Sequence, residues 1–428
     1  MKFAVCTLGC KVNTYESEYI SNVFIKNGYT KVNFDELADI YIINTCTVTN
    51  TSDQKSRKMI RQARKRNQDA LVVVMGCFSQ IRENDDAILD ISDVVIGNTN
   101  KNKIYDIVCD ALKTKKKVFK VENIMDSSFE DMEVVDFNSR VRAFVKIEDG
   151  CENYCTYCII PYVRGKVRSK KKDDVIKEVT SLVKNGHKEI VLTGIHTGHY
   201  GADLKDYDFS DLLLELEKID GLDRIRISSI EITELNDKFI DTLKKSKKIA
   251  DHIHIPLQAG SDTILKLMNR KYDLKYFENK INEIRKVRPL IAITTDVIVG
   301  FPGESDKYFE DTIKFVKKIN FAGGHVFPYS ARRNTPAAKM DGQITKEEKH
   351  ERCKKLIKVF DELEDNYYRK YINKVVRVIP EVSSDGYLIG HTSNYLRVKF
   401  CGCENLIGKE VDVKVSDIEP KLLIGKMI

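Results

Sequence analysis

The sequence has no apolar run of about 18 residues, the length that a membrane-spanning helix needs. Its first residues, Met1–Cys6, lack the separate basic and apolar regions of a secretory signal peptide and instead suit a first strand. These absences predict a cytoplasmic protein that does not associate with membranes. Eleven cysteines in such a chain argue against a disulfide framework and favour metal binding or catalysis.

Length and charge further restrict the class of protein. With 428 residues the chain is too long for one ordinary hydrophobic core, so we expect two or three domains. Hydrophobic residues make up 42% and charged residues 32%, which is typical of a globular protein. The net charge of +7 is a modest excess that permits a nucleic-acid partner without requiring one.

Three cysteines, Cys151, Cys155 and Cys158, stand close together with the spacing C-x3-C-x2-C. No fourth cysteine or histidine lies beside them in the sequence. A structural zinc site is closed by four protein ligands, whereas thiolates are the usual ligands of a four-iron cluster. Three thiolates leave one iron open to a small molecule. The motif therefore favours a [4Fe-4S] cluster over three unrelated buried thiols or a loose metal site.

The first hundred residues alternate short β-rich runs with amphipathic stretches. This alternation predicts a parallel sheet with crossover helices. The expected strands are Lys2–Thr7, Asp39–Asn44, Leu71–Met75 and Asp93–Ile96, and the expected helices are Tyr15–Lys26 and Gln54–Arg66. We also expect Asn13 to cap the first helix together with Glu16.

Three further cysteines, Cys10, Cys46 and Cys77, each lie just beyond the carboxyl end of an expected strand. In an open α/β sheet ligands bind at that edge, so we expect these thiols to meet as a second three-thiolate site. Gly9 and Gly76 precede two of them, and glycine allows the backbone to approach a bulky cofactor. The alternative is that three ordinary buried cysteines occupy these positions by chance.

From Val141 onward the sequence predicts six more βα units, which suit a partial barrel better than a closed one of eight. The expected strands are Ala143–Ile147, Glu189–Leu192, Arg224–Ser228, His252–Ile255, Ile291–Val297 and Ala322–Phe327. The Cys151–Cys158 loop follows the first of them, at the carboxyl mouth where such barrels carry their chemistry. Glycine-rich and polar turns after the other strands suit a ligand of nucleoside size.

We divide the chain into four parts: a parallel-sheet α/β domain (1–113), a linker (114–136), the barrel domain (137–370) and a small C-terminal β-barrel (371–428). The linker has a basic run and an acidic stretch, typical of a solvated connector. The last part contains the alternating segments Val375–Val382, Tyr387–Phe400 and Glu410–Asp417. Its basic and aromatic residues are compatible with a surface that binds phosphates and stacks bases. They are Lys374, Arg377, Tyr387, Tyr395, Arg397, Lys399 and Phe400.

Six motifs resemble those of the radical S-adenosylmethionine (SAM) methylthiotransferases and stand in that family's order. They lie at Thr7–Asn13, Asn44–Thr49, Gly76–Cys77, Cys151–Gly165, Pro256–Asp262 and Thr295–Glu304. The likeness covers nearly the whole chain. The small C-terminal barrel resembles the RNA-binding TRAM module that is appended to this family.

The resemblance implies two [4Fe-4S] clusters and SAM as cofactors. The cluster that cleaves SAM to a 5′-deoxyadenosyl radical would be held by Cys151, Cys155 and Cys158. An auxiliary cluster, whose open iron carries the sulfur to be transferred, would be held by Cys10, Cys46 and Cys77. One SAM methylates this sulfur, and a second yields the radical that takes hydrogen from an unactivated C–H bond. The methylthio group then joins the resulting carbon radical.

The resemblance also implies residues that contact SAM around the barrel mouth. Tyr157, between the last two cysteines of the motif, would contact the adenine through its backbone. The other implied contacts are Thr193, Gly194, Ser229, Glu231 and Gln258.

The family acts on isopentenyladenosine in tRNA, on threonylcarbamoyladenosine in tRNA, or on an aspartate of a ribosomal protein. The sequences at Cys10–Asn13 and Asn394–Val398 resemble the threonylcarbamoyl branch. That branch adds a methylthio group to C2 of N6-threonylcarbamoyladenosine at position 37, beside the anticodon. The implied partners are tRNA and a reductant protein such as a flavodoxin or ferredoxin, and we expect a monomer.

Two alternatives stay open on the sequence alone. The first alternative is a methylthiotransferase that acts on another of these substrates. The second is a zinc-containing RNA-binding protein without catalytic activity. A densely basic helix within residues 54–66 is compatible with a solvated face and with contact to an RNA backbone. Cys6 and Cys109 are expected in the core, whereas Cys401 and Cys403 form a C-x-C pair without an assigned role.

Overall fold

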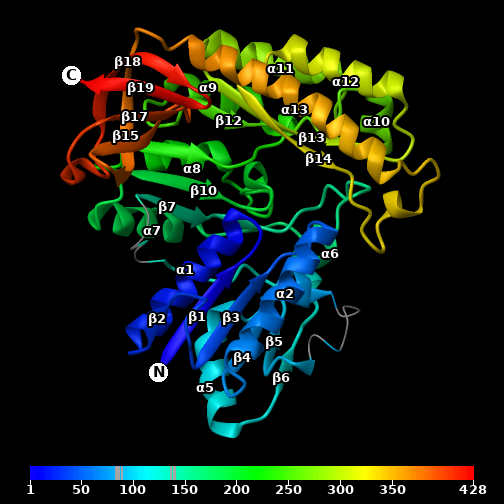
Figure 1. Ribbon diagram of the computed structural model, residues 1–428, viewed down its shortest axis with the longest axis vertical. Coiled ribbons are helices and arrows are strands. Elements are labelled where there is room, and N and C mark those ends of the chain that lie inside the picture. The colour runs from blue at the N-terminus through cyan, green and yellow to red at the C-terminus, as the bar shows by residue number, and fades with distance from the viewer. Residues whose placement is uncertain (82–86, 88–89, 135–136, 138–140) are drawn as a thin grey trace.

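Three structural parts follow one another along the chain (Figure 1). The computed structural model describes residues 1–81, 87, 90–134, 137 and 141–428. In the view of Figure 1 an N-terminal sheet with its helices lies below a central arc of strands and helices, and a small C-terminal barrel adjoins this arc. The expected fold class is confirmed.

The N-terminal sheet consists of parallel strands in the order β2-β1-β3-β4-β5-β6. These are β1 (Lys2–Thr7), β2 (Thr30–Val32), β3 (Ile40–Thr45), β4 (Leu71–Gly76), β5 (Val94–Ile96) and β6 (Val118–Lys120). The helices are α1 (Lys11–Lys26), α2 (Asn50–Arg66), α3 (Cys77–Gln80) and α5 (Ile104–Thr114). The sequence pattern did not predict β2 and β6, because three-residue edge strands have too few apolar positions to show a period.

Helices cover both faces of this sheet, which explains why its central strands are continuous apolar runs. Phe24 of α1 and Val108 of α5 pack in one hydrophobic cluster, and Ile60 of α2 packs in the cluster on the other face. All six residues of β3 are buried between them. The covered faces leave the carboxyl edge of the sheet as the place for chemistry.

The segment expected to be a solvated linker contributes to two cores instead. β6 pairs with β5 in the first sheet, and Met132 and Val134 are buried in the core of the central domain. Isolated apolar residues in an acidic stretch show no periodicity, so the pattern gave no sign of this packing. The expected boundary at residue 137 adjoins residues 135–136 and 138–140, which lie outside the described residues.

The strands of the central domain form one arc, as expected for a partial barrel. One half contains β7 (Arg142–Lys146), β10 (Glu189–Thr193) and β11 (Arg224–Ile227), and the other contains β12 (His252–His254), β13 (Ala292–Val299) and β14 (Gly323–Pro328). All pairings are parallel, and a bridge from Ser229 to His254 joins the halves. The ribbon β8 (Glu148–Asp149) and β9 (Arg168–Ser169) flanks the cysteine loop.

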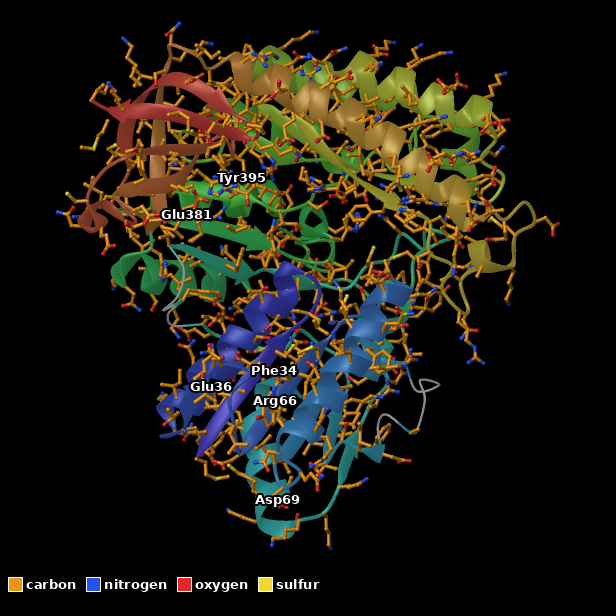
Figure 2. The ribbon with its side chains drawn as sticks, viewed as in Figure 1. Phe34, Glu36, Arg66, Asp69, Glu381 and Tyr395 are labelled. Atoms are coloured by element: carbon orange, nitrogen blue, oxygen red, sulfur yellow. The ribbon has the colours of Figure 1, made fainter. Side chains whose placement is uncertain are left out.

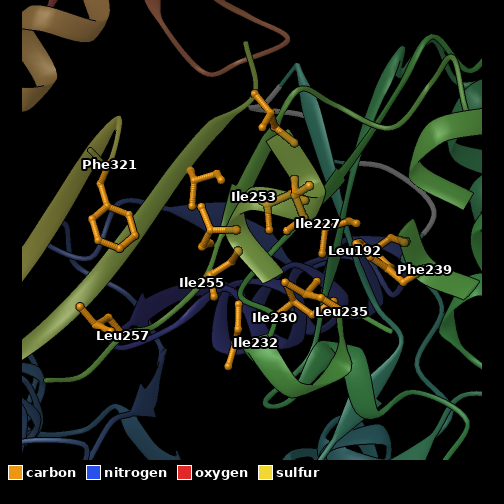
Figure 3. Packing of buried hydrophobic residues seen from close by; sticks show 14 of the residues in the cluster. Leu192, Ile227, Ile230, Ile232, Leu235, Phe239, Ile253, Ile255, Leu257 and Phe321 are labelled. Atoms are coloured by element: carbon orange, nitrogen blue, oxygen red, sulfur yellow. The ribbon is translucent and has the colours of Figure 1, made fainter. Parts of the chain in front are cut away.

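Helices pack against the outer face of this arc and fix which side chains point inward. They are α7 (Lys172–Lys184), α8 (Phe209–Glu217), α9 (Asp237–Lys245), α10 (Asp262–Leu267), α11 (Leu274–Val287), α12 (Asp306–Ile319) and α13 (Lys346–Arg369), with the short α6 (Ile160–Arg164) after the cysteine loop. Figure 3 shows Ile227 and Ile253 of the strands in the same hydrophobic cluster as Phe239 of α9. Because side chains alternate along a strand, Arg226 and His252 lie on the opposite, inner face.

The C-terminal barrel closes in the order β15-β16-β17-β19-β18. Its strands are β15 (Val375–Ser384), β16 (Tyr387–Thr392), β17 (Arg397–Cys401), β18 (Val411–Glu419) and β19 (Leu422–Met427). The expected segment Tyr387–Phe400 is thus two strands, and β19 was not predicted. Phe400 is 1% exposed in the barrel core, so it does not belong to a base-stacking surface. No helix in the described part of the chain is long and apolar enough to cross a membrane.

Candidate functional site

Cys10, Cys46 and Cys77 lie together at the carboxyl edge of the N-terminal sheet. Gly9, with φ +99°, brings the first of these loops over the second, because a Cβ added there would lie 3.0 Å from the Cys46 sulfur. Burial raises the pKa of Cys46, and the nearby Cys77 and Cys10 sulfurs raise it further. Cys10 faces open space, yet burial still raises its pKa, with Arg164 opposing the shift. The three cysteines thus lie at one edge of the sheet, and their role as ligands of one cluster stays a prediction.

Such a group of crowded thiols is suited to a metal cluster. Thiols whose pKa values are raised stay protonated near neutral pH, and only thiolates bind metal strongly. A bound cation reverses that balance by stabilising the deprotonated sulfurs. Within the described residues no histidine or carboxylate completes a four-ligand set with these sulfurs, so the donor set fits an iron–sulfur cluster with one open iron better than closed zinc.

Arg164 contacts this thiol group from the central domain. Its side chain is fully buried, and Nε donates to the Cys77 sulfur at 3.2 Å. The remaining guanidinium nitrogens donate to Asn13 Oδ1 at 2.6 Å and to Glu16 Oε1 at 2.8 Å. Asn13 and Glu16 lie inside α1, which begins at Lys11 with Cys10 at its N-cap. The expected capping role of this pair is therefore wrong, because tertiary hydrogen bonds occupy both side chains.

Glu16 is the negative centre of a buried ionic network between the two domains. Lys101 Nζ lies 2.6 Å from Glu16 Oε2, and Lys146 Nζ lies 3.3 Å from Oε1. Burial alone would raise the pKa of Glu16, but Arg164, Lys101 and Lys146 outweigh it and hold the pKa well below its usual value. Asp149, at 2.6 Å from Lys146, adds a second carboxylate. The network joins residues of α1, the segment before α5, β7, β8 and α6.

A helix of one turn connects the two cysteine groups directly. α6 begins two residues after Cys158 and ends at Arg164. Ile159 and Val163 pack against Cys77 in one apolar cluster, and the Val163 carbonyl accepts a hydrogen bond from Asn98 Nδ2 at 2.7 Å. The segment that directly follows the C-x3-C-x2-C motif therefore packs against the other group of thiols.

The loop with Cys151, Cys155 and Cys158 is held by the backbone and by one arginine. Cys151 N donates to the Gly165 carbonyl at 3.0 Å, and Cys158 N to the Cys155 carbonyl at 2.9 Å. Arg270 Nη1 donates to the Cys155 sulfur at 3.3 Å. Burial raises the pKa of Cys158 to about 12, and the nearby Cys155 adds to this rise. A bound cation would oppose this shift by stabilising the Cys158 thiolate.

The residues expected to contact SAM lie at the carboxyl mouth of the central barrel, and each has different neighbours there. Glu231 forms an ion pair with Arg270, whose charge also acts on Tyr157. Thr193 ends β10, and a Cβ added at Gly194 would lie 2.5 Å from Glu148 Oε2. Ser229 is exposed after β11, and Gln258, with φ +65°, bonds through its backbone to Asp296 and Ile298.

Several residues of this site left no sign in the sequence that we recognised. Glu148 is buried, accepts a hydrogen bond from His196 N at 2.7 Å, and has its pKa raised well above the usual value by burial. Arg164 lies inside a motif, yet its partners Cys77, Glu16 and Asn13 lie between 87 and 151 residues away along the chain. In the sequence such residues differ from others only in being charged residues near a cysteine. Charged residues are too common for this feature to identify a functional residue.

The chain matches three family models in order. Residues 145–316 match the radical SAM superfamily, and residues 369–428 match the TRAM domain. Residues 2–97 match an uncharacterized protein family, UPF0004. The three matches coincide with the central barrel, the C-terminal barrel and the N-terminal sheet.

The chain is also similar over nearly its full length to curated proteins. It is 45% identical over 416 residues to the threonylcarbamoyladenosine tRNA methylthiotransferase MtaB of Bacillus subtilis, covering 96% of this chain and 92% of that protein. The protein of the same name from Aquifex aeolicus is 39% identical, with 97% and 100% covered. A tRNA-2-methylthio-N(6)-dimethylallyladenosine synthase of Clostridium perfringens is 35% identical, with 100% and 97% covered.

Solved structures share the fold at low sequence identity. The radical S-adenosylmethionine methyltransferase TsrM of Kitasatospora setae, with cobalamin and a [4Fe-4S] cluster bound, has a TM-score of 0.58 and 14% identity, covering 78% of this chain and 76% of that one. The cobalamin-dependent S-adenosylmethionine radical enzyme OxsB has a TM-score of 0.53 and 11% identity, covering 78% and 54%. These likenesses concern the arrangement of strands and helices.

Replacement of Gly150 by alanine tests the fixed path of the cysteine loop. Gly150 has φ +99°, and an added Cβ would lie 1.9 Å from the Lys166 carbonyl oxygen. Gly186 is a matched control, since it has φ +98° with nothing within 4 Å. We expect Gly186→Ala to cost only the positive-φ strain, about 1–2 kcal/mol. Gly150→Ala should lower the thermal midpoint markedly more and reduce iron content. Equal effects of the two substitutions would contradict this.

Replacement of Arg164 by methionine tests the buried network. The change leaves Glu16 and the Cys77 sulfur without their guanidinium partner, and breaking a buried ion pair costs about 3–5 kcal/mol. Arg369→Met removes an exposed ion pair to Asp365 and should cost less than about 1 kcal/mol. Denaturant unfolding of the two variants measures the difference. A similar loss in both would show that Arg164 has no special structural weight.

Proposed function

The chain belongs to the tRNA methylthiotransferase family, and we propose that it adds a methylthio group to C2 of N6-threonylcarbamoyladenosine at position 37 of tRNA. The observation that carries this proposal is the pair of three-cysteine groups joined through α6. An enzyme that both opens a C–H bond and delivers sulfur to it needs two reactive centres held side by side.

Two [4Fe-4S] clusters and SAM are the cofactors that these residues suit. We assign one cluster to Cys151, Cys155 and Cys158 and the auxiliary cluster to Cys10, Cys46 and Cys77. When bound, they and SAM supply the radical that activates the C–H bond and the sulfur that replaces its hydrogen. The residues of the chain position these groups, place charges beside them and exclude water from them.

The fixed cations beside the sulfurs are the protein's electrostatic contribution. Arg270 donates to Cys155 and Arg164 donates to Cys77, so within the described residues each three-cysteine group has one charged donor. Hydrogen bonds to ligand sulfurs and nearby charges tune the potential of an iron–sulfur cluster. Because both arginines are buried and paired, their positions do not depend on solvent.

SAM contacts are proposed at the mouth around the first of these groups. Tyr157 lies within the cysteine loop, and Glu231 forms an ion pair with Arg270, whose charge acts on Tyr157. The other proposed contacts are Thr193, Gly194, Ser229 and Gln258. Their support is their position at the carboxyl ends of β10, β11 and β12.

tRNA is the macromolecular substrate that the relatives and the TRAM domain support. Exposed cations on α2 form one stripe that suits contact with phosphates. They are Lys55, Lys58, Arg61 and Lys65. We propose that the protein works as a cytoplasmic monomer and receives electrons from a flavodoxin- or ferredoxin-like reductant.

The second candidate substrate is the dimethylallyl nucleoside named for the 35% identical relative. The higher identity to the two threonylcarbamoyladenosine enzymes favours the first candidate. The two nucleosides differ in the group on N6, which mass spectrometry separates.

Nucleoside mass spectrometry of tRNA tests the proposal. Anaerobically reconstituted protein, SAM and a reductant are mixed with tRNA that carries threonylcarbamoyladenosine or dimethylallyladenosine. We expect the methylthio product from the first tRNA only. Cys10→Ala should abolish it, whereas Cys401→Ala, which changes an exposed thiol, should leave it unchanged. Product from the dimethylallyl tRNA alone would overturn the substrate assignment.

A further inference from the structure

We propose that Lys11 binds the carboxylate of the threonylcarbamoyl group and thereby selects the substrate at the inner face of the central strands. This inference rests on the proposed function and names the residue that would read the N6 substituent. Lys11 directly follows Cys10 and is the first residue of α1. Its position ties substrate selection to the place where sulfur is delivered.

The chemistry of the base requires a cation close to the auxiliary cysteines. In adenine only N1 separates C2 from C6, so the N6 substituent and C2 lie on the same edge of the ring. A threonylcarbamoyl group therefore brings its carboxylate near any centre that reacts at C2. A carboxylate removed from water needs a charged partner.

The inner face of the arc is polar, and two of its buried atoms lack a hydrogen-bond partner within the described residues. His254 Nε2 lies 3.2 Å from Asp296 Oδ2, and His252 Nε2 lies 2.9 Å from Thr294 Oγ1. The other ring nitrogen of His252 and the other oxygen of Asp296 are the two unpartnered atoms. Buried polar atoms in native proteins are normally satisfied, so this face is suited to a polar ligand.

The arginines of this face already have carboxylate partners within the protein. Arg226 Nε donates to Glu189 Oε1 at 2.8 Å, and Arg142 Nη2 donates to Glu381 Oε2 at 2.9 Å. Both guanidinium groups also lie over the Tyr395 ring, at 4.7 and 5.3 Å from its centroid. Figure 2 shows Tyr395 and Glu381 where the C-terminal barrel meets the central strands.

Lys11 is different, because its side chain has no hydrogen bond or ion pair to any residue that the structure describes. The charges that act on it belong to Arg226 and Arg142, which repel it, and to Cys10 and Asp296, which attract it. Lys11 is exposed to solvent, although burial is the largest effect that lowers the pKa of its ammonium group. Lys11 is therefore a cation without a carboxylate partner, and the carboxylate of a ligand would supply that partner. The uncharged dimethylallyl group would not.

Binding of synthetic anticodon stem-loops tests this assignment without relying on turnover. Reconstituted full-length protein is titrated anaerobically with fluorescent RNA that carries threonylcarbamoyladenosine at position 37, either as the free acid or as its methyl ester. The ester removes the charge and keeps the shape. We expect wild-type protein to bind the acid about tenfold more tightly, which corresponds to roughly 1.4 kcal/mol.

The variants separate this role from a general effect of charge. Lys11→Gln should bind acid and ester alike, and Lys11→Arg should keep the preference for the acid. Lys26→Gln removes an exposed cation from the far end of α1 and should behave as wild type. A preference that survives in Lys11→Gln, or that is missing from wild type, would overturn the assignment. Neither result affects the proposed function, which fails only if wild-type enzyme does not convert the acid-bearing tRNA.

Discussion

The guanidinium group of Arg164, buried between two domains, is the interaction on which the rest of this site depends. It contacts a cysteine sulfur, an asparagine and a glutamate of the N-terminal domain, although it belongs to the segment that continues from the C-x3-C-x2-C loop. A buried charge is costly unless each of its donors is satisfied, so its partners cannot move independently. One contact thus fixes the position of both cysteine groups.

This constraint explains why the two domains form one site rather than two. The carboxyl edge of the N-terminal sheet and the mouth of the central arc are each ordinary places for ligands. Glu16, Lys101 and Lys146 hold these two edges against each other in a buried contact. The C-terminal barrel adds a third wall, because the Thr392 and Ser393 carbonyls accept hydrogen bonds from Arg226 and Tyr395 covers its guanidinium.

Much of the fold could be predicted from local patterns, and the contacts between domains could not. Strand ends located Cys10, Cys46 and Cys77, since parallel strands bring their carboxyl ends to one edge whatever the spacing along the chain. The same reasoning failed for Asn13 and Glu16, where a capping pattern was outweighed by side-chain partners about 30 to 150 residues away. It also failed for β6 and β19, which are held by neighbouring strands rather than by a pattern of their own.

The central claim is that two separate three-cysteine groups each hold a four-iron cluster. Iron analysis with Mössbauer spectroscopy of anaerobically reconstituted protein tests it most directly. We expect about eight iron atoms in wild type. We expect about half as many when the Cys151, Cys155 and Cys158 group or the Cys10, Cys46 and Cys77 group is replaced by alanine, and none when both are replaced. Zinc in place of iron, or loss of all iron on replacing either group alone, would contradict it.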